Sequence, residues 1–262
     1  AFAVNRMDTE NANFEKVFEA LREQFGPSVV PLQLPIMKGD KFAGYVDIAA
    51  HEGVEFDPKQ NKIVPIPENL ETEVDHYRSI LVETAAESSE ELMEKFFEGE
   101  EFSLEELTAG IRAGILTGSL TPVFCTAAAP QLGVSRLMDS IVRFFPAPNE
   151  AAARAGVNPK DDSEVKRACS ADEPFSAQVF KTLADAFVGK ISLFKVYSGK
   201  LTVDTPIYNP TAEKNEKIGS VLYMVGKKTA SIDELVAGDI GAVAKLQYTA
   251  TGDTLCDGAD IA

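Results

Sequence analysis

The chain opens with Phe2-Ala3-Val4-Asn5-Arg6-Met7-Asp8, a short apolar run followed by Asn-x-x-Asp. The apolar run predicts a buried strand, and the polar residues after it predict a loop at the carboxyl end of that strand. In open α/β sheets, ligands bind outside the carboxyl ends of the strands. The stretch therefore predicts an α/β domain with a binding loop at residues 5–8.

The side chains of this loop match the chemistry of a guanine base. A carboxylate at Asp8 offers two acceptors side by side, and guanine offers two donors, its N1–H and its exocyclic amine. Adenine lacks that pair of donors and would leave the carboxylate unpaired, a mismatch that discriminates strongly. Asn5 is expected to donate to the acceptor edge of the base or to brace neighbouring loops, and Arg6 to lie flat on the purine. A helix N-cap explains the same four residues equally well.

A second segment has the same organisation of strand, loop and helix. Residues 120–129 form a β-rich apolar run that ends in small residues, and an apolar helical spacing follows Gly133 until Pro146. The small side chains of Thr126, Ala127 and Ala128 would let a backbone N–H approach the guanine oxygen. An ordinary turn between a strand and a helix remains the alternative interpretation.

The composition is that of a globular protein of one large domain or two. The chain has 262 residues, of which 45% are hydrophobic and 25% are charged. No apolar run reaches membrane-spanning length and no signal peptide is visible, so we expect a cytoplasmic protein without a membrane partner. The three cysteines and two histidines show no metal-ligand or catalytic spacing. We therefore expect no metal site and no catalytic residue in this sequence.

The net charge of −16 is concentrated in one segment. Residues 68–106 carry 14 acidic and two basic residues. Ser88 to Glu91 and Ser103 to Glu106 both fit capping boxes, and Gly118 is a plausible helix end, which together predict acidic helices. Such helices are either a solvated face or a docking face for a basic protein surface.

The last third of the sequence predicts a small β-barrel. From Glu173 onward, short strand-like runs alternate with Gly- and Asp-containing turns. Residues 146–171 are rich in Pro, Ala, Asp and Lys and are predicted to be a linker. Lysines lie on or beside the predicted strands, and they would suit contact with an RNA backbone: Lys190, Lys195, Lys200, Lys214, Lys217, Lys227 and Lys228.

Several stretches resemble bacterial elongation factor G, the GTPase that drives ribosomal translocation. They are Val4 to Asp8, Ala85 to Lys95, Gly133 to Pro148, Glu173 to Ser176, Phe187-Val188-Gly189-Lys190, Val196 to Gly199, Ala237 to Ile240, and Thr251 to Asp257. The resemblance implies a multidomain fold of α/β plus all-β class. Residues 1–145 would be the C-terminal part of a GTPase domain with an α+β insertion at about residues 40–117. Residues 172–262 would be the domain-two barrel of translation factors.

The resemblance also implies partners and site residues. Guanine contacts would fall on Asn5, Arg6, Asp8, Thr126, Ala127 and Ala128. The family usually has Lys where Arg6 stands and Ser-Ala where Thr126-Ala127 stands, which suggests a divergent member. GTP or GDP, ribosomal RNA and the ribosomal stalk protein would be partners of the full-length protein.

Motifs for phosphate chemistry are missing from these residues. No Gly-x4-Gly-Lys-Ser/Thr loop and no Asp-x-x-Gly for magnesium occur, and Gly226-Lys227-Lys228-Thr229 lacks the required spacing. We therefore expect a central piece of a longer factor that is inactive in GTP hydrolysis alone. A sister factor of the release or ribosome-protection type, or a non-catalytic acidic interaction module, would fit the same observations.

Overall fold

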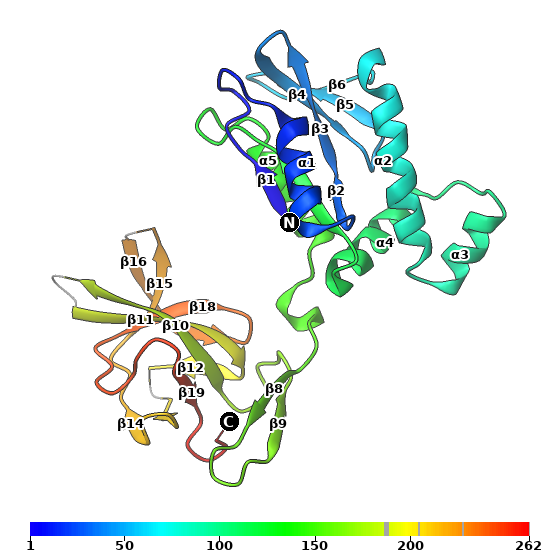
Figure 1. The fold of residues 1–262 in the computed structure, drawn as a ribbon. Helices are drawn as coiled ribbons and strands as arrows, with labels where there is room; N and C mark the ends of the chain where they lie inside the picture. The colour runs from blue at the N-terminus through cyan, green and yellow to red at the C-terminus, as the bar shows by residue number, and fades with distance from the viewer. Residues whose placement is uncertain (186–188, 204, 227, 262) are drawn as a thin grey trace. The chain divides into compact units, whose positions relative to one another are not determined.

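The computed structural model describes residues 1–185, 189–203, 205–226 and 228–261, which form two compact units, Ala1–Pro146 and Ala147–Ala262 (Figure 1). Phe187, Val188 and Lys227, which are named above, lie outside the described residues. The first unit combines helices with two small sheets, and the second unit is almost entirely β-structure. The chain is thus a mixed α/β part followed by an all-β part.

A three-stranded parallel sheet lies at the centre of the first unit. Its order is β1 (Phe2–Val4), β7 (Thr121–Cys125), β2 (Val29–Pro31). The helix predicted after Gly133 is confirmed as α5 (Val134–Phe144), and a further helix, α1 (Phe14–Phe25), follows β1. The Asn13 side chain accepts the Lys16 N–H at the start of α1, which satisfies one of the free donors of its first turn.

A four-stranded antiparallel sheet also belongs to the first unit. It follows the chain in the order β3 (Gln33–Lys38), β4 (Lys41–Asp47), β5 (Glu52–Glu55) and β6 (Lys62–Val64). Six of the seven β4 residues are buried, because the strand lies between two neighbours and against the core of the first unit.

Three helices follow this sheet: α2 (Glu68–Ala86), α3 (Glu90–Phe97) and α4 (Leu104–Thr117). The capping box of Ser103 and the left-handed helix end at Gly118 are confirmed. The capping box predicted from Ser88 is wrong, because Ser89 caps α3 and accepts the Leu92 N–H, while the Ser88 hydroxyl donates to the Ala85 carbonyl. The residue three positions after Ser89 is a leucine, which has no group to complete a box.

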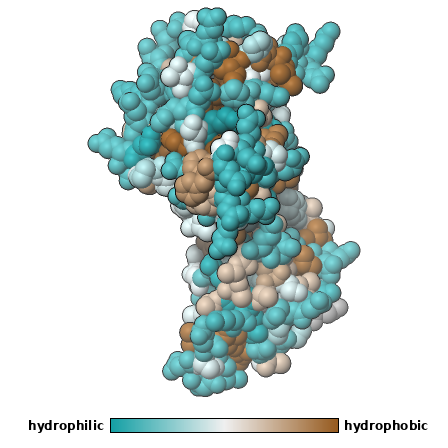
Figure 2. Space-filling model, turned by 90° about the vertical axis from the view of Figure 1, so that its right-hand side faces the viewer, coloured by the Kyte–Doolittle hydropathy of each residue, from teal (hydrophilic) through white to brown (hydrophobic). Residues whose placement is uncertain are grey.

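The face drawn in Figure 2 is largely hydrophilic, and hydrophobic residues are scattered among the hydrophilic ones. Inside the first unit, a single apolar core joins the parallel sheet, the antiparallel sheet and α2 and α4. Val123, Leu81 and Ile111 are all fully buried in it. No helix in the described residues is long and apolar enough to cross a membrane.

The second unit is built on an eight-stranded sheet. Its order is β14 (Lys214–Glu216), β13 (Ile207–Asn209), β19 (Thr254–Cys256), β10 (Ser176–Asp185), β11 (Gly189–Ser198), β18 (Ile240–Ala244), β15 (Val221–Val225), β16 (Lys228–Ile232). A second pair, β12 (Lys200–Thr202) and β17 (Glu234–Val236), stands beside it.

Side chains from the eight-stranded sheet and from the β12–β17 pair share the larger of the two apolar clusters found among the described residues of this unit. Val179, Phe194 and Val243 come from the middle of the large sheet, and Leu201 and Leu235 come from the small one. Because strands on all sides contribute to a common interior, the unit has the enclosed core of a small barrel.

The segment predicted as a linker contains regular structure. Residues 146–171 hold a 3-10 turn, η1 (Pro148–Glu150), and a hairpin of β8 (Arg154–Val157) and β9 (Glu164–Arg167). The polar composition hid this hairpin, because its turn is made by side chains of Asn158 and Asp161 that accept backbone N–H groups two residues on. The Arg167 guanidinium also binds the Asp260 carboxylate at 2.6 Å, which fixes the hairpin by a contact distant in sequence.

Candidate functional site

The two predicted binding loops leave neighbouring strands at the same edge of the parallel sheet. β1 pairs with β7 so that Val4 lies opposite Cys125, and residues 5–8 and 126–128 follow directly. The Thr126 N–H donates to the Val4 carbonyl at 2.9 Å, and the Met7 N–H donates to the Thr126 carbonyl at 3.1 Å. The structure thus brings all six predicted site residues into two adjoining loops.

Asn5 joins these loops through its side chain. Its Oδ1 accepts the Ala128 N–H at 2.9 Å, and the Thr126 hydroxyl lies 3.5 Å from the same oxygen. The shorter contact has the length of an ordinary hydrogen bond and the longer one is at the outer limit. Asn5 therefore does the bracing that its sequence position suggested, and its Nδ2 has no hydrogen-bond partner among the described residues.

Backbone geometry holds the 5–8 loop in a tight turn. Arg6 has a φ of 62°, in the left-handed region that costs an L-residue roughly 1 kcal/mol or more. Two contacts offset this cost, because the Thr9 N–H and hydroxyl both donate to the Arg6 carbonyl, at 3.1 and 2.8 Å. Met7 is 2% exposed and anchors the turn in the core.

Asp8 and Arg6 point their functional groups outward. Both residues are exposed, and neither side chain has a hydrogen bond or ion pair within the described part of the chain. Some other carboxylates of the first unit are paired, as Glu55 is with Lys38 at 2.6 Å. The Asp8 carboxylate is therefore available to a ligand without displacing an internal contact.

The backbone donors of the second loop are already in use. The N–H of Thr126 goes to Val4, that of Ala127 to the Leu132 carbonyl at 2.9 Å, and that of Ala128 to Asn5. The expected contact from one of these N–H groups to a guanine oxygen is not available in this arrangement. Among the described residues, the Asn5 Nδ2 and the Arg6 guanidinium are side-chain donors of the 5–8 loop that have no partner.

Gly133 closes the second loop and starts α5. Its φ is 74°, and a Cβ at this position would lie 2.8 Å from the Cys125 carbonyl oxygen. Real Cβ atoms do not approach oxygen this closely, so only glycine lets the chain double back to the end of β7. The paired bonds between Ala127 and Leu132 depend on this return.

Two features of the first unit were not predicted from the sequence: the buried Gln33 and the ion pair of Arg136 with Asp47. Gln33 is buried, its Oε1 lies 3.4 Å from the Cys125 nitrogen, and its Nε2 has no partner in the described structure. The Arg136 guanidinium donates to the Asp47 carboxylate, which joins the first turn of α5 to the end of β4. The sequence offered one signal for Gln33, which is its position between Leu32 and Leu34. A polar side chain inside an apolar run is usually buried only where it makes a hydrogen bond.

The rest of the unit offers little for metal or nucleophilic chemistry. No cluster of three or more His, Cys, Asp or Glu side chains able to hold a metal occurs among the described residues. Burial raises the pKa of the Cys125 thiol, so this cysteine stays protonated and unreactive at neutral pH. Burial likewise raises the pKa of Tyr45 to about 12.

Comparison with known proteins identifies the second unit. The family model described as elongation factor G domain 2 matches residues 174–258. This part of the chain is therefore similar to elongation factor G domain 2. The resemblance to elongation factor G drawn from the sequence is thereby confirmed, and its β-rich domain-two prediction with it.

A solved structure matches over both units. It is a crystal structure of a protein from Thermus thermophilus, with a TM-score of 0.79 and 24% sequence identity. The match covers 99% of this chain and 36% of that chain, so this sequence spans about a third of the matched protein. At this identity the likeness shows a shared fold, and it does so for both units.

Proposed function

We propose that the chain is part of an elongation-factor-G-type translational GTPase in which residues 1–145 read the guanine base of GTP or GDP. The match of residues 174–258 to elongation factor G domain 2 supports the family. The observation that carries the base assignment is the bond from the Ala128 N–H to Asn5 Oδ1, which fixes the loop that presents the unpaired Asp8 carboxylate.

In this proposal the carboxylate of Asp8 accepts the N1–H and the exocyclic amine of guanine together. The Asn5 Nδ2 donates toward the oxygen of the base, and the exposed Arg6 guanidinium stacks on the purine face. Thr126, Ala127 and Ala128 form the floor, where the small side chains leave room for the ring. An adenine would meet the carboxylate with no paired donors and be rejected.

Phosphate handling is not assigned to these residues. The sequence carries no Gly-x4-Gly-Lys-Ser/Thr motif, and phosphoryl transfer depends on positioning the phosphates and a magnesium ion. We therefore propose that these 262 residues recognise the base weakly and do not hydrolyse GTP by themselves.

The remaining surfaces fit work on the ribosome in the cytoplasm. The barrel lysines suit ribosomal RNA backbone, since cation contacts with phosphates supply most sequence-independent affinity. The acidic helices suit a basic partner such as a protein of the ribosomal stalk, because opposite charge steers association. Both partners belong to the full-length factor in this proposal.

Swapping the recognised base tests the proposal directly. The substitution Asp8→Asn leaves one acceptor and adds one donor, which matches xanthine, whose C2 carries an oxygen in place of the amine. Wild-type and variant protein labelled with ¹⁵N are titrated with guanosine and xanthosine, and shifts of the Met7 and Ala128 amides are followed. Guanosine should shift these amides in the wild type and xanthosine in Asp8→Asn.

The matched control is Asp40→Asn, which removes the same charge from the exposed turn between β3 and β4. This control should keep the guanosine response of the wild type. Equal responses of wild type and Asp8→Asn to both nucleosides would refute base reading by Asp8.

A further inference from the structure

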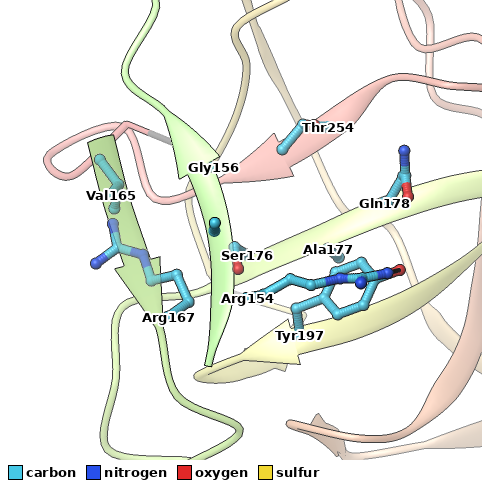
Figure 3. Close-up of a pocket in the computed structure, with 10 residues that line it drawn as sticks. Arg154, Gly156, Val165, Arg167, Ser176, Ala177, Gln178, Tyr197 and Thr254 are labelled. Atoms are coloured by element: carbon cyan, nitrogen blue, oxygen red, sulfur yellow. Dashed lines mark hydrogen bonds between the residues drawn. The ribbon is translucent and has the colours of Figure 1, made fainter. Parts of the chain in front are cut away.

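Two adjoining cavities lie between the β8–β9 hairpin and the large sheet of the second unit. Their volumes are about 170 and 190 Å³, and both are lined by Arg154, Arg167 and Tyr197. Figure 3 shows the cavity of about 170 Å³, with the hairpin on one side and β10, β11 and β19 on the other. We name the two cavities together the hairpin groove.

The groove has one sign of charge. Its lining includes the cations Arg154, Arg167 and Lys195, and no Asp or Glu of the described residues lines either cavity. The whole chain carries a net charge of −16, so a cavity wall that has cations and no carboxylates differs from the average charge of the sequence. Clefts lined by one sign of charge concentrate ligands of the opposite sign.

The centre of the groove is a flat aromatic surface. The Arg154 guanidinium lies over the Tyr197 ring at 4.9 Å from its centroid, and Arg154 Nη2 donates to the Tyr197 hydroxyl at 3.3 Å (Figure 3). The Lys195 ammonium is 5.8 Å from the same centroid. Planar rings flanked by guanidinium groups are surfaces on which nucleobases stack.

Polar groups at the groove lack partners inside the protein. The side chains of Gln178 and Thr254 line the first cavity, and neither has a hydrogen-bond partner in the described parts of the chain. Arg167 is 8% exposed, and its Nε is buried without a partner there, while its Nη2 binds Asp260. A buried guanidinium that is only partly satisfied gains from an anion nearby.

We propose that the hairpin groove binds one nucleotide, with its phosphate near Arg154 and Lys195 and its base stacked on Tyr197. Gln178 and Thr254 meet the polar edge of the base, and Arg167 adds its charge from behind. Each cavity has room for one of these two parts of the ligand. The ligand is either a free nucleotide or one nucleotide of a single-stranded RNA, since both present the same chemistry.

This site is separate from the proposed guanine loops and does not rest on them. It lies wholly in the second unit, and base stacking on tyrosine tolerates any base. Adenine is therefore the suitable probe, because the proposed Asp8 site rejects it. Failure at the groove would leave the guanine proposal standing, and the reverse also holds.

The test measures binding of AMP and of a fluorescent tetra-adenylate to the 262-residue chain, by calorimetry and by anisotropy. Arg154→Ala should weaken both at least tenfold, since it removes one of the two cations that the proposal places near the phosphate. Lys166→Ala is the matched control on the same hairpin, because Lys166 is exposed and lines neither cavity. It should change affinity less than twofold.

Two further variants separate the parts of the site and guard against misfolding of the hairpin. Lys195→Gln, on β11, should weaken AMP and inorganic phosphate alike, whereas Tyr197→Leu should weaken AMP but not inorganic phosphate. Circular dichroism establishes that each variant is folded.

Comparing AMP with tetra-adenylate shows whether the bound nucleotide is free or part of a single-stranded RNA. Tetra-adenylate bound at least tenfold more tightly than AMP indicates RNA, and equal affinity indicates a free nucleotide. The proposal is overturned if the folded wild type shows no saturable AMP or tetra-adenylate binding. It is equally overturned if Arg154→Ala, Lys195→Gln and Lys166→Ala bind alike.

Discussion

The Asn5 side chain makes a contact whose removal has a calculable effect. Replacing Asn5 by Ala deletes the acceptor of the Ala128 N–H at 2.9 Å and the weak contact with the Thr126 hydroxyl at 3.5 Å. A hydrogen bond of this kind contributes about 1 kcal/mol net, and the longer contact adds little. The 126–128 loop should therefore open about five times more often.

Amide hydrogen exchange measured by NMR reports this opening residue by residue. We expect the Ala128 amide of Asn5→Ala to exchange about fivefold faster, because exchange follows the population of locally open states. The Leu132 amide, which is bonded to the Ala127 carbonyl, should be less affected. Guanosine should also produce smaller shifts in this variant, since its Asp8 loop is less well fixed.

Two controls make the result specific. Asn61→Ala removes an exposed asparagine outside both loops and should leave Ala128 exchange unchanged. Asn5→Asp keeps an acceptor oxygen at the same place and should preserve most of the protection. If Asn5→Ala and Asn61→Ala give the same Ala128 exchange rate, the bracing role of Asn5 is refuted.

Two further predictions concern stability. Gly133→Ala places a Cβ 2.8 Å from the Cys125 oxygen on a left-handed backbone, so it should lower the free energy of unfolding in urea by about 2–4 kcal/mol. The control Gly118→Ala should lower it by about 1 kcal/mol, because Gly118 has a φ of 83° but no atom within 4 Å of the added Cβ. Equal losses would show that the close approach is unimportant. The hydrogen bond from Lys95 lowers the pKa of Glu106 to about 2, so its stabilising contribution is present above its unfolded pKa near 4.5 and lost as pH falls toward about 2. Urea midpoints at about pH 5 and pH 2.5 should therefore differ less in Glu106→Gln than in wild type, and an unchanged difference would contradict this.

Local signals predicted the elements of the fold well where one residue acts on its near neighbours. The capping box at Ser103 and the helix end at Gly118 depend only on residues within four positions, and both are present. Ser88 and Ser89 show the limit of such signals. Because the two serines are adjacent, either could be the N-cap of α3. Which of them caps the helix depends on how α3 packs against the rest of the unit.

Contacts between distant residues explain what the sequence could not show. The hairpin at 154–167 is held by Arg154 on Tyr197 and by Arg167 with Asp260, and neither pairing is visible in a polar segment. The donors of the second loop were expected to be free for a ligand. Instead, Thr126 donates to Val4 and Ala128 donates to Asn5, and Ala127 donates to Leu132 because the chain turns back at Gly133.

The bond between Asn5 and Ala128 has a consequence for how the first unit folds. The two residues are 123 positions apart, and bringing them together in an otherwise unfolded chain would cost about 4 kcal/mol of loop entropy. One hydrogen bond cannot offset this cost. The loops can meet only after the intervening sheet and helices have condensed around β7, so the bond between Asn5 and Ala128 is a sign that the whole unit has finished folding.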